Sequence, residues 1–251
     1  MEPNTTSIAS GLERVKARIE AIAKKTGRSP ESITLLAASK TNPAECLREA
    51  FVAGQRIFGE NYLQEALTKM PQLTDLPIEW HFIGPIQSNK TRRIAENFAW
   101  VHSIDRKKIA DRLSKDRPES LPPLQVCVQV NVSGEDSKSG VAPEEATDLA
   151  AHIAGLPRLK LRGVMAIPEL TKATALQRNQ FRMLKDVYDR LKQAGHDVDT
   201  VSMGMSEDLD VAIEEGATLV RVGTAIFGPR RYAIPEELAA EAAKAKASEK
   251  A

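Results

Sequence analysis

A lysine at the end of a short apolar run is the residue best placed to do covalent chemistry in this sequence. Residues 33–38 lead directly into Ser39 and Lys40, and Asn42-Pro43 then opens a loop. A strand end of this kind holds a side chain on rigid backbone and leaves it open to a ligand. A desolvated lysine amine can form a Schiff base with a carbonyl. Lys40 is therefore a candidate nucleophile, although most lysines are solvated or ion-paired.

Two later segments have the composition of phosphate-binding loops. Residues 201–206, Val-Ser-Met-Gly-Met-Ser, supply hydroxyls, a flexible glycine and the start of a predicted helix. Residues 221–224, Arg-Val-Gly-Thr, supply backbone N–H groups and a hydroxyl. Helix N-termini and clustered backbone N–H groups bind anions. A Gly-Thr pair after a strand is more often only a turn, so neither segment identifies a phosphate site by itself.

An alternation of strands and helices would position these residues. Apolar residues recur at helical spacing near the N-terminus, which predicts an amphipathic helix over about residues 5–25. Eight β-branched or apolar runs follow, each with a helix-like stretch behind it, and this order indicates parallel strands with right-handed crossovers. The predicted strands are residues 33–39, 56–59, 79–83, 100–103, 124–132, 160–166, 199–203 and 219–223.

Eight such units are the number that a closed α/β barrel needs, so we predict a (β/α)8 TIM barrel forming a single domain over residues 1–251. The barrel would span about residues 33–232, and residues 233–251 would form a charged helical tail. An open doubly wound sheet usually has a glycine-rich turn after its first strand, where this sequence has Lys40-Thr41-Asn42-Pro43. Because strand eight pairs with strand one in a closed barrel, the fold places Lys40 beside residues 221–224.

A reactive amine next to a phosphate-binding loop suits pyridoxal phosphate (PLP). This cofactor carries an aldehyde and a phosphate on one compact ring and is held in proteins as a Schiff base with a lysine. Arg221 would then lie near the ring nitrogen and, as a permanent cation, would keep it unprotonated. Asn61 and His81 belong to polar clusters on the same rim. Helix capping and a structural core histidine are the more common roles for such residues.

The composition argues against several other classes of protein. A net charge of +1 gives no basic face for nucleic acid, and 42% hydrophobic residues are enough for a globular core. Cys46, Cys127 and the four histidines show no metal-binding or disulfide spacing, so we expect no metal site. We find neither a secretory signal nor an apolar run long enough to cross a membrane, and therefore expect a cytoplasmic protein without membrane contact.

Six motifs together resemble the pyridoxal phosphate homeostasis protein family. They occur in order between about Leu35 and Tyr232 and comprise ASKT at 38–41, FGENY at 58–62, HFIGPIQSNK at 81–90, GVMAIP at 163–168, SMGMS at 202–206 and RVGTAIFG at 221–228. The resemblance implies a barrel similar to the N-terminal domain of alanine racemase. It also implies PLP bound as a Schiff base on Lys40.

The resemblance further implies a role for individual residues. The implied PLP-binding residues are Lys40, Asn61, His81, Met165, Ser202, Arg221, Gly223 and Thr224. Within this set Ser202, Gly223 and Thr224 would hold the phosphate, and Arg221 would face the ring nitrogen. Lys138 matches a mobile-loop lysine of the family and would take part in cofactor transfer. No catalytic residue is implied.

Members of this family are regarded as binding PLP and handing it on, with effects on vitamin B6 balance. We therefore expect a monomeric, non-enzymatic PLP carrier with PLP-dependent apoenzymes as candidate recipients. A PLP-dependent amino-acid racemase is the main alternative. Racemases of this fold add a second domain whose tyrosine, from a partner subunit, acts as a base on the opposite face, and this sequence ends soon after its last predicted strand. A Schiff-base aldolase acting on a sugar phosphate is a third possibility.

Overall fold

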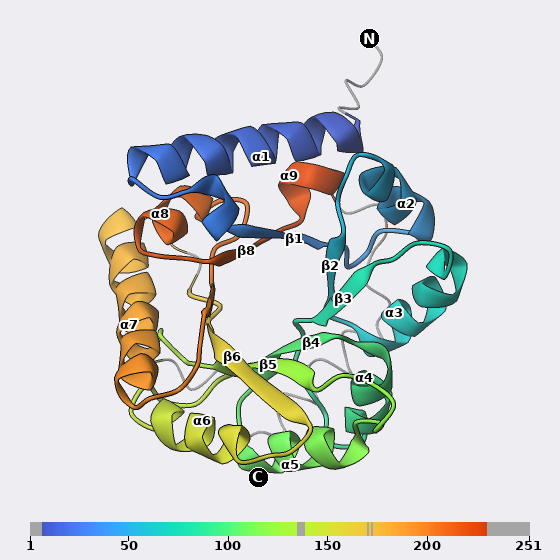
Figure 1. The fold of residues 1–251 in the computed structure, drawn as a ribbon. Coiled ribbons are helices and arrows are strands. Elements are labelled where there is room, and N and C mark those ends of the chain that lie inside the picture. Colours follow the sequence, from blue (N-terminus) through green and yellow to red (C-terminus); the bar gives the residue numbers. More distant parts are fainter. Residues whose placement is uncertain (1–6, 135–138, 170, 172, 230–251) are drawn as a thin grey trace.

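A closed barrel of eight parallel strands forms the centre of the molecule (Figure 1). The structure is a computed structural model that describes residues 7–134, 139–169, 171 and 173–229. The strands are β1 (Thr34–Ala38), β2 (Ile57–Glu60), β3 (Glu79–Phe82), β4 (Trp100–Ile104), β5 (Leu124–Gln129), β6 (Leu159–Met165), β7 (Thr200–Ser202) and β8 (Leu219–Val222). Each strand pairs with the next along the chain, and β8 pairs with β1. The prediction of a (β/α)8 TIM barrel is confirmed.

Helices surround the ring of strands (Figure 1). They are α1 (Ile8–Lys25), α2 (Ala44–Val52), α3 (Leu63–Lys69), α4 (Thr91–Asn97), α5 (Lys107–Asp116), α6 (Ala146–Ala154), α7 (Thr174–Gln193), α8 (Leu209–Glu214) and α9 (Thr224–Phe227), with short 3-10 turns at Pro30–Ser32 and Met70–Leu73. Every strand is thus followed by a helix, as the alternating sequence pattern indicates.

Helix α1 precedes the barrel and packs against α8 and α9. It begins at Ile8 because the Ser7 hydroxyl accepts a hydrogen bond from the Ser10 N–H at 3.2 Å, which satisfies one of the free donors of the first turn. A side chain at Gly11 would place its Cβ 2.6 Å from the Ile226 carbonyl oxygen, so this glycine permits the close approach of α1 and α9. In Figure 1 α1 lies along the top edge of the molecule, on the outer side of α8 and α9.

The strand bounds differ from the predicted ones by a few residues. The largest difference is in β5, which was expected to reach Val132 and ends at Gln129. Beyond that point the Val130 N–H still donates to the Met165 carbonyl of β6 at 2.8 Å, and Val130 forms an isolated bridge with Val141. The predicted tail at 233–251 and the last residues of the predicted barrel lie outside the described residues.

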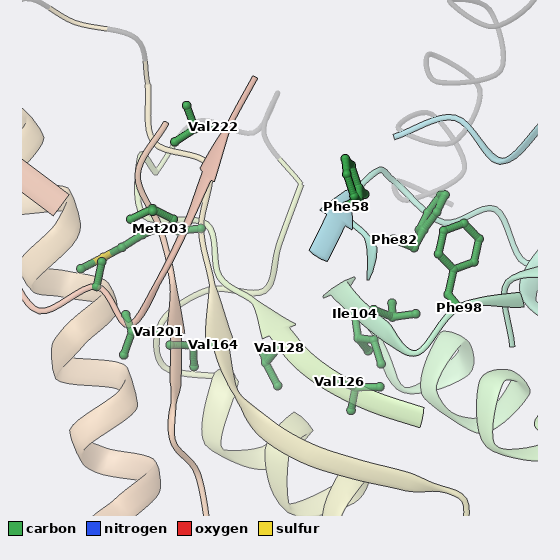
Figure 2. Close-up of a cluster of buried hydrophobic side chains, with 14 of the residues drawn as sticks. Phe58, Phe82, Phe98, Ile104, Val126, Val128, Val164, Val201, Met203 and Val222 are labelled. Atoms are coloured by element: carbon green, nitrogen blue, oxygen red, sulfur yellow. The ribbon is translucent and has the colours of Figure 1, made fainter. Parts of the chain in front are cut away.

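Two different environments lie on the two faces of the strands. The side chains that point toward the helices form one continuous apolar core, which includes Phe58, Phe82, Val126, Val164 and Val201 (Figure 2). Burying this surface is the main favourable term in folding. The opposite, inward face has two small apolar clusters, one with Leu36, Ile83 and Leu219 and the other with Trp100, Cys127 and Met165.

The remaining inward positions are polar. His81, His102, Ser202 and Arg221 are all at most 4% exposed. Buried polar groups are stable only when they are hydrogen-bonded, so these side chains must find partners inside the barrel.

In the described part of the chain, no helix has both the length and the hydropathy needed to cross a bilayer. Nor do its His, Cys, Asp and Glu side chains form a group that could hold a metal ion.

Candidate functional site

A cavity of about 580 Å³ opens at the C-terminal ends of the strands. Active sites of this fold occur at this face, and the volume is in the usual range for small ligands. The loops after β1, β2, β7 and β8 contribute most of its wall. The polar lining residues central to the argument are Lys40, Asn61, Ser206, Arg221, Gly223 and Thr224.

Lys40 is the second residue after β1 and lies in a tightly held loop. The next residue, Thr41, has a φ of 61°, which is unfavourable for a β-branched side chain. Its backbone N–H donates to Glu65 Oε1 at 2.7 Å, and the Asn42 side-chain amide donates to the Lys40 carbonyl at 3.0 Å. The side chain of Lys40 is half-buried at the cavity wall. These contacts fix the backbone from which the amine projects.

A buried acid–lysine cluster, consisting of Glu60, Glu65 and Lys69, lies under this loop. Lys69 Nζ is 2.6 Å from Glu60 Oε1 and 2.7 Å from Glu65 Oε1. The same ammonium donates to the carbonyls of Ser39 and Asn42 at 3.0 and 3.1 Å, and so ties together the residues on either side of Lys40 and Thr41. Burial raises the pKa of Glu60 to about 7, against the opposing effect of Lys69.

Unpartnered polar atoms are concentrated around the same loop. Buried side-chain oxygens without a hydrogen-bond partner occur in the described residues at Thr41 Oγ1, Asn42 Oδ1, Glu60 Oε2, Asn61 Oδ1, Glu65 Oε2 and Gln180 Oε1. Three of these residues, Thr41, Asn42 and Asn61, line the cavity. A buried oxygen without a partner is costly, so these positions suit a ligand or water that supplies donors.

The other side of the cavity is formed by the β7 and β8 loops. The Ser206 hydroxyl accepts a hydrogen bond from the Ala225 N–H at 3.4 Å, which joins the two loops. A Cβ on Gly223 would lie 3.0 Å from the Ala38 carbonyl oxygen, so glycine allows the β8 loop to approach β1 closely. Thr224 is exposed at the same rim. Hydroxyl and backbone groups of the β7 and β8 loops therefore line the same cavity as Lys40, as the closed barrel predicts.

Arg221 of β8 lines the cavity, and two hydrogen bonds fix its guanidinium. Its Nη1 donates to Ser202 Oγ at 2.7 Å, and its Nη2 donates to the Ala166 carbonyl at 2.8 Å. Burial lowers the pKa of Arg221 to about 10, and Asp208 opposes that shift. The guanidinium therefore remains a cation at neutral pH.

A chain of hydrogen-bonded side chains continues from Ser202 through the barrel. Ser202 Oγ is 2.8 Å from His102 Nδ1, and His102 Nε2 is 2.9 Å from His81 Nδ1. His81 Nε2 in turn is 2.8 Å from Oε1 of Glu79, at the N-terminal end of β3. We call Arg221, Ser202, His102, His81 and Glu79 the relay. The Trp100 ring stacks on His81 with centroids 5.0 Å apart.

The structure brings five of the eight residues predicted to bind PLP to the cavity wall: Lys40, Asn61, Arg221, Gly223 and Thr224. It does not bring the other three there. His81 and Ser202 are buried members of the relay, and Met165 packs against Trp100 and Cys127. These side chains sit one layer deeper in the barrel than the rim. Lys138, the predicted transfer residue, lies outside the described residues.

Several residues of the site were not found from the sequence. Ser206 lines the cavity, whereas the prediction selected Ser202 from the same motif. Glu60 belongs to the FGENY motif, which does not indicate its burial, and nothing in the local sequence distinguishes Lys69 from an exposed helical lysine. The spacing of Glu65 and Lys69, four residues apart on α3, was the available signal for an ion pair.

Comparisons with known proteins agree with this arrangement. The model of the alanine racemase N-terminal domain family matches residues 11–231. The pyridoxal phosphate homeostasis protein of Pseudomonas aeruginosa is 58% identical over 92% of this chain and 99% of its own length. The protein of the same name from Escherichia coli K12 is 51% identical over 90% of this chain and 97% of its own length.

Two solved structures show the same fold. PipY of Synechococcus elongatus, in a structure with PLP bound, is 36% identical and has a TM-score of 0.79, covering 88% of this chain and all, 100%, of that one. Alanine racemase of Clostridium difficile has a TM-score of 0.71 at 14% identity, covering 90% of this chain and 59% of the racemase, and supports the fold alone. The chain belongs to the pyridoxal phosphate homeostasis protein family, whose barrel is that of the alanine racemase N-terminal domain.

Proposed function

We propose that this protein binds PLP as a Schiff base on Lys40 and holds it for vitamin B6 homeostasis, buffering or delivering the cofactor. The observation that carries the proposal is the single cavity that joins the Lys40 loop to Ser206, Gly223, Thr224 and Arg221. The names of the relatives and the PLP bound to PipY support it.

The residues present fit this cofactor. A lysine, two hydroxyls and a guanidinium converge on the cavity, and they are the groups that an aldehyde, a phosphate and a ring nitrogen require. The unpartnered oxygens of Asn61 and Asn42 could accept hydrogen bonds from ring substituents or bound water. We propose Ser206 as a phosphate ligand in place of Ser202, because the Ser202 hydroxyl is engaged by Arg221 and His102.

Each residue contributes a defined part of the binding. PLP supplies an aldehyde that condenses with a neutral amine and a phosphate that anchors the ring. Lys40 would provide the amine, on a backbone clamped by Lys69. Arg221 would donate toward the ring nitrogen and, as a buried cation, would disfavour a proton there. This arrangement makes a weak electron sink, which suits storage better than turnover.

We further propose that the protein has no enzymatic turnover of its own, acts as a monomer in the cytoplasm and passes PLP to apoenzymes. The curated relatives are named for homeostasis and not for a reaction, which supports the first point. The racemase alternative makes a distinct prediction. A racemase would exchange the α-proton of an amino acid for deuterium in heavy water, whereas the carrier would give no exchange above that of free PLP.

Borohydride reduction tests the binding assignment. The PLP-loaded protein is reduced, digested and searched by mass spectrometry for the modified peptide. We expect the label on Lys40 and loss of the visible imine absorbance in Lys40→Ala. Lys108→Ala, which removes an exposed lysine of α5, is the control and should keep both signals. A label on another lysine, with the absorbance retained in Lys40→Ala, would refute the assignment.

Transfer to an apoenzyme tests the delivery role. The loaded protein is mixed with a PLP-dependent apoenzyme, and the rate of activation is compared with the rate given by an equal concentration of free PLP and with the rate of spontaneous release. Faster activation than spontaneous release allows would support direct delivery. Activation limited by release would leave buffering as the function.

A further inference from the structure

The relay connects the cavity to the opposite end of the barrel. Arg221 lines the cavity, and Glu79 lines a groove at the N-terminal end of the strands, where its side chain is 47% exposed. Between them Ser202, His102 and His81 are at most 1% exposed. All four links between neighbouring members measure 2.7 to 2.9 Å.

The proton positions in the relay follow from its two ends. A guanidinium only donates, so Ser202 Oγ accepts from Arg221 and its own hydrogen is available for His102 Nδ1. A His102 that accepts at Nδ1 carries its proton on Nε2 and donates to His81 Nδ1. His81 then carries its proton on Nε2 and donates to the Glu79 carboxylate. Every donor points from the arginine toward the glutamate.

The reverse direction needs an extra proton. If His102 Nδ1 donated to Ser202, a neutral His102 would have to accept at Nε2 from His81 Nδ1. His81 could then form its hydrogen bond with Glu79 only if His81 were an imidazolium or if the Glu79 carboxyl were protonated. Burial lowers the pKa of both histidines, and the hydrogen bond from His81 lowers the pKa of Glu79. The extra proton is therefore disfavoured at neutral pH.

The charged groups around the relay also favour neutral histidines and an ionised Glu79. Arg162 lies 4.6 Å above the Trp100 ring that stacks on His81, and it also lowers the pKa of Glu79. Asp199 pairs with Arg162, and Asp208 faces Arg221 at the cavity end. The buried Cys127 thiol, whose pKa burial raises to about 12, remains neutral. Neutral histidines thus connect one cation to one anion.

We propose that Glu79, His81, His102 and Ser202 are positioning residues that act on the cavity through Arg221. The one-way set of hydrogen bonds holds the guanidinium in one orientation and couples it to the carboxylate at the far end of the barrel. The effect on PLP rests on the proposed function, whereas the proton positions do not. Glu79 is the informative residue because it touches nothing in the cavity.

Replacement of Glu79 by glutamine separates this role from a packing role. The amide keeps the shape, but it can donate as well as accept, so it no longer fixes the direction of the relay. Glu96→Gln is the matched control, because Glu96 is an exposed residue that lines the same groove.

The direct measurement is 15N–1H NMR of the histidine rings in cofactor-free protein at neutral pH, with resonances assigned through His81→Gln and His102→Gln. We expect both rings to be neutral with Nε2–H in the wild type and in Glu96→Gln, and to show mixed tautomers in Glu79→Gln. A charged ring, or Nδ1–H on His102, in the wild type would overturn the proposal.

The second readout is the dissociation constant for PLP from the visible absorbance. We expect Glu79→Gln to weaken binding about fivefold relative to Glu96→Gln, in the range of ordinary coupling between sites. Equal affinities of the two variants would overturn the coupling to the cavity. A wild type that binds no PLP would instead refute the proposed function, and the NMR result would still decide the proton positions.

Discussion

The cavity lies between two buried polar systems that are built differently. On the β1–β2 side, the acid–lysine cluster brings Lys69 into direct contact with Glu60 and Glu65, and one buried oxygen of each carboxylate accepts no hydrogen bond. On the β8 side, the relay separates its charges by three neutral groups, and each of those groups has one donor and one acceptor in use.

This difference suggests different tasks. Two carboxylates share one ammonium in the cluster, so its charge can change by one proton near neutral pH, next to the loop that carries Lys40. The two histidines of the relay can gain a proton only if at least one of their hydrogen bonds reverses its direction. The amine side of the cavity is therefore the adjustable side, and the arginine side is the fixed one.

Of the changes that test this difference, removal of Lys69 should have the largest effect on the stability of the protein. Lys69→Met removes the ammonium that two buried carboxylates share and frees the Ser39 and Asn42 carbonyls, and we expect a loss of about 3–5 kcal/mol in the free energy of unfolding. Urea denaturation measures it. Lys24→Met is the control, because Lys24 pairs with Glu20 at the same four-residue spacing on the surface. Such exposed pairs contribute about 0–1 kcal/mol. Equal losses would contradict a special role for the cluster.

The pH dependence of stability should report the proton that Glu60 binds in the folded protein. The pKa of Glu60 is raised to about 7 in the folded protein from 4.5, so the folded state holds a proton that the unfolded state has lost between these values. Stability should therefore fall as the pH rises from 4.5 to 7, by on the order of 1–3 kcal/mol from this group.

The variant Glu60→Gln checks the source of that slope. Denaturation curves collected across this pH range should lose the fall in Glu60→Gln and keep it in Glu20→Gln, which replaces an exposed glutamate of α1. The same slope in all three proteins would mean that the proton is bound elsewhere.

The sequence was sufficient to predict the barrel because each of its signals is local. Period-two and apolar runs mark strands, and the 3.6-residue spacing of Leu12, Val15 and Ile19 marks α1. Lys40, Gly223 and Thr224 could be assigned to the rim because they lie within two residues of a strand end, and parallel strands bring their C-terminal ends to one face.

The depth of a residue inside the barrel could not be predicted in the same way. Ser202 and Ser206 belong to one motif, but the first is level with Leu219 of β8 and the second is in the loop above. That difference depends on the stagger between neighbouring strands, which cannot be deduced from the sequence of any one strand. Likewise, Lys69 is buried only because α3 packs beneath the β1 loop, 30 residues away from Ser39 in the sequence. The relay, which joins four strands, is a product of the same stagger.

The smallest predicted effect concerns the strained residue beside Lys40. Thr41 has a positive φ and a buried hydroxyl without a partner. Thr41→Ala removes the hydroxyl and keeps the strain, whereas Thr41→Gly removes both, so the glycine variant should be more stable than the alanine variant by about 1 kcal/mol.

Comparison of this pair in a Lys69→Met background shows what maintains the strain. If Lys69 holds the loop in its strained form through the Ser39 and Asn42 carbonyls, the backbone can relax without it, and the advantage of glycine over alanine should disappear. An unchanged advantage, measured by urea denaturation, would mean that the β1–α2 connection imposes the conformation by itself. In that case the acid–lysine cluster would adjust charge near Lys40 without controlling its backbone.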